Sequence, residues 1–304
     1  MIHSHSRHAH RPTISGPILL HRDSGQPTQQ WPPLIPRRVH FVWLQRSSSD
    51  RPGLPSAFEP FVAQWRALAP AHDLYLWLEA HIRSEMAEEK LLPFYSALPR
   101  QVLKADFARY VIAMRHGGTV SDLDLVPTTP LLRWFERVSA MLLSPVELVV
   151  APECWNDGTV QMSGYSVRRA HPLLQRVVHD IRSSLVPRRS TISTLDVINT
   201  TGPRAFTRAV SAYLGHPWRD TEARASAAGD DLTFADNGRM LVLPLADLKL
   251  GRLVHMNFNL WAFNKSANID HANWTIDYAA HLVAKRAKAA ARYNCFGPHT
   301  SGGR

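Results

Sequence analysis

Two scarcities in the sequence limit what the protein can be: it has few cysteines and no long hydrophobic run. Cys154 and Cys295 are the only cysteines among 304 residues, too few for the disulfide framework of a small secreted domain. They could pair or stay free. No stretch reaches the roughly 18 apolar residues that a membrane-spanning helix needs. The segment from Ile14 to Leu20 is too short and interrupted for the apolar region of a signal peptide.

Acidic residues are outnumbered as well, and the formal net charge is +10 with a pI near 10.0. A basic surface can bind nucleic acid. Here the arginines are scattered, Arg168-Arg169 and Arg188-Arg189 are only pairs, and no recognised nucleic-acid-binding motif accompanies them. Nucleic acid is therefore not expected as the principal partner. The same charge suits anionic sugar donors, acidic glycans, or lipid headgroups in a peripheral membrane contact.

Composition divides the chain into three parts. Residues 1–33 hold five of the sixteen histidines, together with Pro, Ser and Gln but no periodicity, which predicts a flexible tail. The first ten residues of this tail are also compatible with weak metal chelation. Residues 34–296 are expected to form one domain, because 45% hydrophobic residues and nine Trp supply ample material for a core. The Gly-rich residues 297–304 are expected to fray.

Short apolar runs alternate with helical periodicity along the central part. The runs typical of strands lie at residues 39–44, 74–78, 146–151 and 240–243. The helical patterns lie at residues 57–68, 98–116, 172–185 and 203–213. This alternation predicts an α/β fold with a mostly parallel sheet flanked by helices on both faces, and a ligand site at the carboxyl ends of the strands.

The most informative segment runs from Lys104 to Asp124, KADFARYVIAMRHGGTVSDLD. Its first part has apolar residues at helical spacing, and Asp106 and Arg109 lie on the flank of that apolar stripe. Charges placed beside a core normally need a partner. Gly117 and Gly118 then end the helix in the manner of a left-handed C-cap and permit close backbone approach.

An extended segment follows the glycines and carries Asp122 and Asp124. Residues two apart on an extended chain point the same way, so both carboxylates aim at one point. Mg²⁺ or Mn²⁺ suits such a site, because these hard cations take oxygen ligands and keep positions open for water and phosphates. A cation that bridges a diphosphate neutralises the charge growing on the leaving group as a glycosyl bond breaks.

These residues resemble the glycosyltransferases that carry a DXD sugar-binding motif. That family contains the yeast initiating α-1,6-mannosyltransferase, bacterial capsule transferases and, more distantly, the glucosylating clostridial toxins. The resemblance extends from residue 35 to roughly residue 275. Besides the DXD segment, it includes four stretches: residues 35–43, Tyr75-Leu76-Trp77, Ala170-His171-Pro172 and Thr201-Gly202-Pro203.

The resemblance implies a GT-A-type nucleotide-sugar-binding fold and a retaining reaction. It implies that Trp43 stacks on the nucleobase, and that Asp106 and Arg109 hold the donor sugar and its phosphates. Asp122 and Asp124 would contact the ribose and the metal, with Asp124 ligating the metal most directly. No residue is indicated as the catalytic base.

Some positions stay open. The late segment that closes over the donor in this family corresponds to residues 255–261 or residues 271–274, and we favour the second. A further polar donor-site residue corresponds to Gln161 or Ser163, which the spacing does not distinguish. The chain also departs from the family at Thr119-Val120-Ser121, where a bulky residue is usual; this changes the packing of the strand but is not expected to abolish the site.

Each site residue also has a simpler interpretation. Trp43 is compatible with an ordinary core tryptophan. Asp106 and Arg109 are compatible with a salt bridge at the edge of a helix, which typically contributes about 0–1 kcal/mol when exposed. Asp122 and Asp124 are compatible with turn capping. The ordered set of motifs favours the binding site over these readings.

We therefore expect a metal-dependent hexosyltransferase that uses a UDP- or GDP-hexose and a glycan, glycolipid or protein acceptor, with a role in polysaccharide biosynthesis. Two alternatives are a protein-glucosylating effector and a catalytically degenerate glycan- or nucleic-acid-binding protein on the same scaffold. Eukaryotic members of the family act in the Golgi lumen behind an N-terminal anchor, and bacterial members act on the cytoplasmic side. A cytoplasmic location is expected here, since no such anchor is evident in the sequence.

Overall fold

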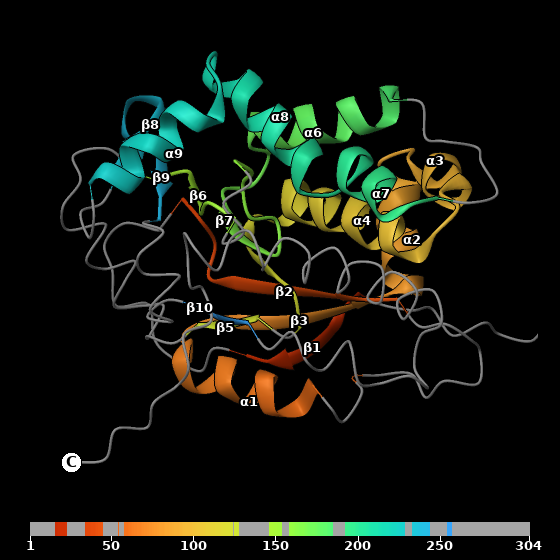
Figure 1. Ribbon diagram of the computed structural model, residues 1–304. Helices are drawn as coiled ribbons and strands as arrows, with labels where there is room; N and C mark the ends of the chain where they lie inside the picture. The colour runs from red at the N-terminus through yellow and green to blue at the C-terminus, as the bar shows by residue number, and fades with distance from the viewer. Residues whose placement is uncertain are drawn as a thin grey trace, which may run out of the picture.

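The computed structural model describes residues 16–22, 34–44, 54, 58–123, 125–127, 146–153, 158–184, 192–228, 233–243 and 254–256. Figure 1 shows a twisted sheet with helices on both faces. The expected α/β class is confirmed. The expected strands and helices listed from the sequence are all present, with bounds that differ by a few residues.

Eight strands form one sheet in the order β1-β3-β2-β4-β7-β6-β9-β8. Their bounds are β1 Ile18–His21, β2 Arg38–Trp43, β3 Asp73–Leu78, β4 Gly118–Ser121, β6 Leu148–Val150, β7 Gly164–Val167, β8 Thr233–Ala235 and β9 Met240–Val242. A second sheet pairs β5, Leu125–Pro127, with β10, Val254–Met256.

The large sheet is mixed, which corrects the expectation of a mostly parallel one. β2 runs parallel to β3 and to β4, and β6 runs parallel to β9, whereas the pairs β1–β3, β4–β7, β6–β7 and β8–β9 are antiparallel. Alternation of helices and strands along a sequence does not report strand direction. The antiparallel bridge between Pro152 and Val160 and the hydrogen bond from the Gln161 amide to the Ala151 carbonyl continue the β6–β7 pairing beyond the two strands, so these strands form an antiparallel hairpin.

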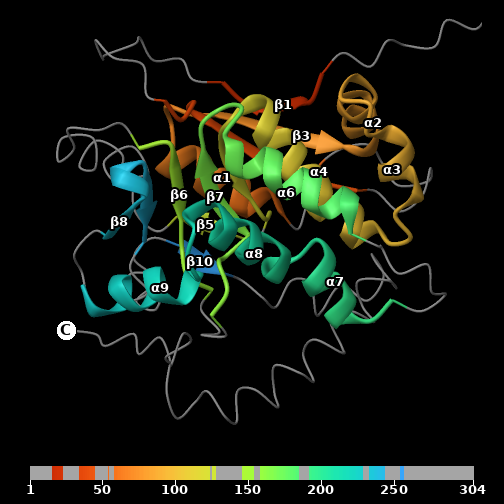
Figure 2. The same cartoon turned by 90° about the horizontal axis from the view of Figure 1, so that it is seen from above.

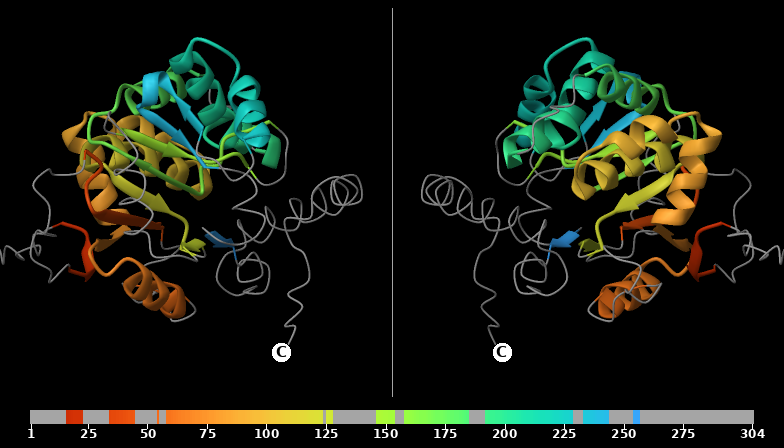
Figure 3. Two further views of the ribbon diagram at one scale, coloured as in Figure 1. Left: turned by 90° about the vertical axis from the view of Figure 1, so that its left-hand side faces the viewer. Right: turned by 90° about the vertical axis from the view of Figure 1, so that its right-hand side faces the viewer.

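The helices cover the two faces unequally (Figures 1 and 3). α1, Glu59–Leu68, lies on one face. The other face carries the long helix α4, Gln101–His116, with α6, Pro172–Ser183, and α8, Pro203–Leu214, packed over it (Figure 2). The other helices in the described part of the chain are α2 Glu79–Glu88, α3 Leu92–Ala97, α7 Thr194–Thr200 and α9 Trp218–Ala227, with a short 3-10 turn at Asp236–Gly238.

Each face of β2 and β3 packs into its own hydrophobic cluster. On the α1 side, Phe41 and Leu76 are fully buried together with Trp65 of the helix. On the other side, Trp77 joins the larger cluster, which contains Phe107 of α4. The two-residue period of a strand explains this division, because neighbouring side chains point to opposite faces.

The expected flexible tail at residues 1–33 is wrong for residues 18–21. Those residues form β1, which pairs antiparallel with β3 in the register Ile18↔Leu76 and Leu19↔Tyr75. Ile18 and Leu20 pack against the α1-side cluster. The run Ile18-Leu19-Leu20 is too short for its own periodicity to reveal a strand, and pairing with β3 decides its conformation. Residues 297–304 and both cysteines lie outside the described residues.

β2, β4 and β6 point the same way, since β4 is parallel to β2, and β7 reverses direction between β4 and β6. Their carboxyl ends therefore meet at one edge of the sheet. Trp43 is the last residue of β2, and Asp122 directly follows β4. Among the described residues, no helix is long and apolar enough to cross a membrane.

Candidate functional site

Helix α4 places two charged residues beside the core. Leu103, Phe107 and Val111 are fully buried along its apolar stripe. Asp106 and Arg109 lie on the flank of that stripe, and their side chains are only 5% and 11% exposed. The sequence pattern predicted this flank position, and the structure confirms it.

The glycine pair ends α4 and starts β4 at once. Gly117 has φ 62° and ψ −170°, so it has the expected positive φ but an extended ψ, and it is not a left-handed helical cap. A Cβ on Gly117 would lie 2.6 Å from the backbone nitrogen of Arg169, and one on Gly118 would lie 2.6 Å from the carbonyl oxygen of Arg38. The predicted close backbone approach is therefore confirmed at both positions, and it fixes where β4 begins.

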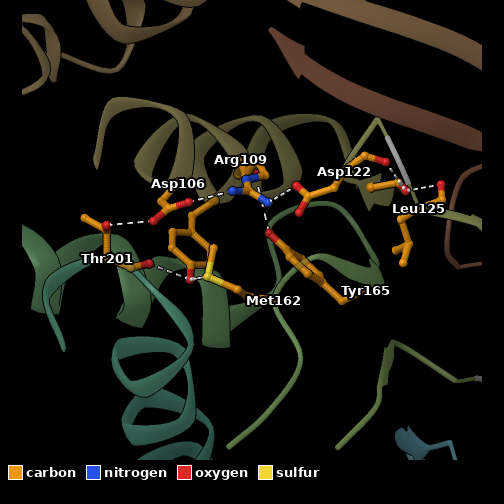
Figure 4. A network of polar contacts seen from close by, with 9 residues as sticks. Asp106, Arg109, Asp122, Leu125, Met162, Tyr165 and Thr201 are labelled. Carbon is orange, nitrogen blue, oxygen red and sulfur yellow. Dashed lines mark hydrogen bonds and ion pairs between the residues drawn. The ribbon is translucent and has the colours of Figure 1, made fainter. Parts of the chain in front are cut away.

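Arg109 lies between two carboxylates, as Figure 4 shows. Its Nη2 donates to Asp106 Oδ1 at 2.5 Å, and its Nη1 donates to Asp122 Oδ1. Asp106 and Arg109 are three residues apart on α4, while Asp122 approaches from the end of β4. We call Asp106, Arg109 and Asp122 the ionic network. The structure thus brings together three of the residues expected to bind the donor.

Burial sets the electrostatics of this network. It raises the pKa of Asp106 to about 6, although Arg109 and a hydrogen bond from Thr201 favour the charged carboxylate. Burial also disfavours the charge on Arg109, but Asp122 and Asp106 outweigh it and raise the pKa of the guanidinium. Asp122 is the outermost member, since its side chain is 34% exposed. Asp106 and Arg109 are therefore buried, and the Asp122 carboxylate is the part of the network that solvent or a ligand can reach.

Side chains from distant parts of the chain surround the network. Thr201 Oγ1 donates to Asp106 Oδ2 at 2.9 Å, and Tyr165 lies beside Arg109, its hydroxyl 3.5 Å from the Arg109 carbonyl oxygen (Figure 4). Sequence reasoning assigned no role to either residue. The Thr201-Gly202-Pro203 motif drew attention to Thr201. It could not reveal that Thr201 contacts Asp106, because the two residues are 95 positions apart in sequence.

Ser163 is the nearer of the two candidates for the further polar residue. Its carbonyl oxygen accepts a hydrogen bond from the Asp122 amide at 2.8 Å. Its hydroxyl is buried and has no hydrogen-bond partner among the described residues. Gln161 precedes Ser163 in the same segment and lies farther from Asp122. Its backbone N–H donates to the carbonyl of Ala151.

Trp43 lies at the same edge of the sheet but belongs to the α1-side cluster. Its ring centroid is 5.2 Å from that of Phe58, the residue that precedes α1. The ionic network lies on the α4 side of the sheet. Stacking of Trp43 on a nucleobase stays a prediction.

The second motif aspartate, Asp124, lies outside the described residues, as do residues 271–274. The strand after it is described: β5 pairs antiparallel with β10, with His255 opposite Val126. The backbone of one candidate late segment thus begins beside the DXD segment. Trp65 of α1 supports this corner by donating to the Leu125 carbonyl at 2.7 Å. The described residues contain no group of three or more His, Cys, Asp or Glu that could hold a metal ion.

Comparison with known families agrees with this geometry. Residues 38–140 match the model described as the glycosyltransferase sugar-binding region containing the DXD motif. This region is thus similar to the DXD glycosyltransferases. It spans β2, the ionic network and both motif aspartates, so the expected resemblance to this family is confirmed over residues 38–140.

Similar proteins include several named mannosyltransferases. The initiation-specific alpha-1,6-mannosyltransferase of Candida albicans is 28% identical over 212 residues, which cover 60% of this chain and 54% of that protein. The putative glycosyltransferase HOC1 of Saccharomyces cerevisiae is 24% identical over 57% of this chain and 48% of its own length. The chain thus spans about half the length of these curated relatives. Among solved structures, PaToxG glycosyltransferase is 12% identical, with a TM-score of 0.44 over 60% of this chain and 70% of that one.

Proposed function

We propose that the protein transfers a hexosyl group from a nucleotide diphosphate sugar to a hydroxyl acceptor, with retention of configuration and with a divalent cation. The ionic network carries this proposal, because it gathers two carboxylates and one guanidinium at the end of β4, within the family region. A buried ion pair with one exposed end suits a charged, hydrogen-bonding ligand better than it suits stability alone.

The residues present fit a hard cation. Asp122 is a partly exposed carboxylate, one oxygen of which receives a hydrogen bond from Arg109. An oxygen donor set of this kind matches Mn²⁺ or Mg²⁺. Asp122 and Asp124 would hold the ion, which supplies positive charge to the diphosphate leaving group. Cys and His ligands are not needed for such a cation.

We assign roles to the remaining residues from their surroundings and, for Trp43, from the resemblance to the family. Arg109 carries a permanent charge and two directed donors, so we assign it the donor phosphates. Asp106 accepts hydrogen bonds and lies deepest, so we assign it the hydroxyls of the sugar. We assign Trp43, at the end of β2, to the nucleobase of the donor, because any nucleobase presents a π face to an indole ring. Ser163, beside Asp122, is a further candidate contact.

Mannose is the first sugar to test. The matched relatives from Candida albicans and Schizosaccharomyces pombe are named alpha-1,6-mannosyltransferases, and another from Schizosaccharomyces pombe is named inositol phosphoceramide mannosyltransferase 2. We therefore propose GDP-mannose as the first donor and a glycan or glycolipid as the acceptor. A cytoplasmic location and a peripheral membrane contact stay predictions.

Thermal unfolding of the purified chain tests the proposal. We would measure the melting temperature with GDP-mannose, UDP-glucose, UDP-galactose and UDP-GlcNAc, each with and without Mn²⁺. A ligand at a hundredfold its Kd stabilises the native state by about 2.7 kcal/mol. A manganese-dependent rise with one donor is expected. A folded sample that responds to none of the four would favour a degenerate scaffold instead.

A further inference from the structure

The Thr201-Gly202-Pro203 motif forms the junction between α7 and α8 and has no role in the function proposed above. Pro203 begins α8, where a missing N–H costs nothing. Gly202 lies so close to α7 that an added Cβ would be 2.8 Å from Ile198 Cα. These two residues explain the sharp junction. They do not explain the threonine that precedes them.

Thr201 is fully buried and is bound to α4 through two groups. Its hydroxyl donates to Asp106 Oδ2 at 2.9 Å, and its carbonyl oxygen accepts from the Tyr110 hydroxyl at 2.9 Å. Asp106 and Tyr110 are four residues apart and therefore share one face of the helix. The two hydrogen bonds thus hold the threonine against α4 at the level of Asp106.

The hydroxyl of Thr201 determines how Asp106 is oriented. Asp106 Oδ1 accepts from Arg109, and Oδ2 accepts from Thr201, so each carboxylate oxygen has its own donor (Figure 4). Without the hydroxyl, Oδ2 would be left buried and unpaired, which is unfavourable for a charged group. The carboxylate would then relax by rotating toward the guanidinium. Arg109 would follow and weaken its contact with Asp122.

We propose that Thr201 is a positioning residue of the donor site: its hydroxyl holds the Asp106 carboxylate so that Arg109 is directed at Asp122 and at the donor. This inference rests on the proposed function for its ligand, a nucleotide diphosphate sugar. It links the junction of α7 and α8 to the ionic network, whose three members come from α4 and the end of β4. The motif is thereby a part of the binding site that lies outside residues 38–140.

The chain provides a matched control for a lost buried hydroxyl. Thr119 of β4 is 7% exposed, and its Oγ1 lies 2.7 Å from Ser166 Oγ. Thr119→Val and Thr201→Val therefore remove the same group from two buried positions. Only the second removes a donor from Asp106. Thr201→Ser keeps the hydroxyl and loses a methyl group.

We would measure the Kd for GDP-mannose with Mn²⁺ by calorimetry, after circular dichroism has shown each variant to be folded. Thr201→Val is expected to raise the Kd about tenfold, as expected for one hydrogen bond to a charged group. Thr201→Ser and Thr119→Val are expected to stay within about twofold of the wild type. An unchanged Kd in Thr201→Val, an equal loss in Thr119→Val, or an equal loss in Thr201→Ser would each overturn the proposal.

A second readout does not depend on any donor. The ¹⁵N–¹H signals of the Arg109 guanidinium, identified with Arg109→Lys, report how that group is held. Thr201→Val should shift or broaden them, and Thr119→Val should leave them in place. If the wild type binds no nucleotide sugar, the proposed function fails, and these signals alone decide the positioning role. Unchanged Arg109 signals in Thr201→Val would overturn it, whatever the donor result.

Discussion

Helix α4 contacts two polar networks, one at its C-terminal end and one at its middle, and they differ in charge and in exposure. At the C-terminal end, His40 of β2 is 1% exposed and has a partner for each ring nitrogen: Nε2 donates to the Gly117 carbonyl at 2.8 Å, and Nδ1 accepts from Trp77 at 3.1 Å. Burial lowers the pKa of His40 to about 3, so the ring is neutral. At the middle of α4, the ionic network is charged and is partly exposed at Asp122.

This difference separates a structural network from a binding one. Neutral groups that satisfy one another inside the core fix the geometry of β2, β3 and α4 and leave nothing for a ligand. Buried charges are costly, and replacing them with apolar residues is often neutral or stabilising. A buried ion pair with one exposed carboxylate is therefore better explained by a ligand than by stability.

The largest expected effect is at the second motif aspartate. Asp124→Asn should lower sugar transfer at least about a hundredfold, because it removes charge that holds the cation at the developing leaving group. Transfer from GDP-mannose would be measured alongside thermal unfolding. The control is Asp180→Asn. Asp180 forms an exposed ion pair with Arg176 on α6, so this substitution should change neither sugar transfer nor thermal unfolding. Full activity in Asp124→Asn would sink the metal role.

Arginine substitutions compare the middle of α4 with its C-terminal end. Arg109→Ala should weaken donor binding about tenfold to a hundredfold and destabilise the fold by about 3–5 kcal/mol, since it leaves two carboxylates without their partner. Arg115→Ala breaks ion pairs with Glu85 and Glu88 but should cost only about 1 kcal/mol and leave the donor Kd unchanged. Calorimetry gives the Kd for the donor, and urea unfolding gives the free energy of unfolding. Equal donor affinities in the two variants would contradict the assignment of Arg109.

A substitution in the His40 network should change the stability of the fold but not donor binding. His40→Leu leaves the Gly117 carbonyl and the Trp77 indole N–H without their partner, which should cost about 1–3 kcal/mol in unfolding free energy. The donor Kd should stay that of the wild type. A His40→Leu variant that is stable but cannot bind the donor would show that the His40 network and the ionic network are not independent.

The smallest expected effect is a contrast in pH dependence. The raised pKa of Asp106 favours the folded state below its unfolded value of 3.8, and this contribution is lost as pH rises through about 6. The lowered pKa of His40 acts in the opposite direction: its contribution is present above 6.5 and is lost as pH falls toward about 3.

Urea unfolding at several pH values between 4 and 6.5 tests this contrast. Asp106→Asn should make stability rise more steeply with pH than in the wild type, and His40→Leu should make it rise less steeply. A change of the same sign in both variants would show that burial does not dominate at one of the two sites.

Local patterns in the sequence were sufficient for much of the site. The spacing of apolar residues along α4 placed Asp106 and Arg109 beside the core, and the two glycines marked the turn into β4. These features depend on a single helix and on backbone geometry, so neighbouring residues determine them. Family resemblance added the roles of the residues but not their contacts.

Other features depend on partners far away in sequence. Ile18–His21 forms a strand because it pairs with the edge of β3, and the direction of β7 is seen only in its antiparallel pairing with β4 and β6. Only the pairing of β4 with β7 shows that Ser163, rather than Gln161, lies beside Asp122. No periodicity within one segment reports such pairings.

The sequence by itself determined the helix that carries Asp106 and Arg109, the turn that follows it and the position of the two motif aspartates, because each depends on residues close in the chain. Only the tertiary structure decided that Arg109 bridges Asp106 to Asp122 and that Thr201 completes the buried carboxylate. Buried charges take whichever donors the fold brings to them, and those donors come from segments that meet only when the chain is folded.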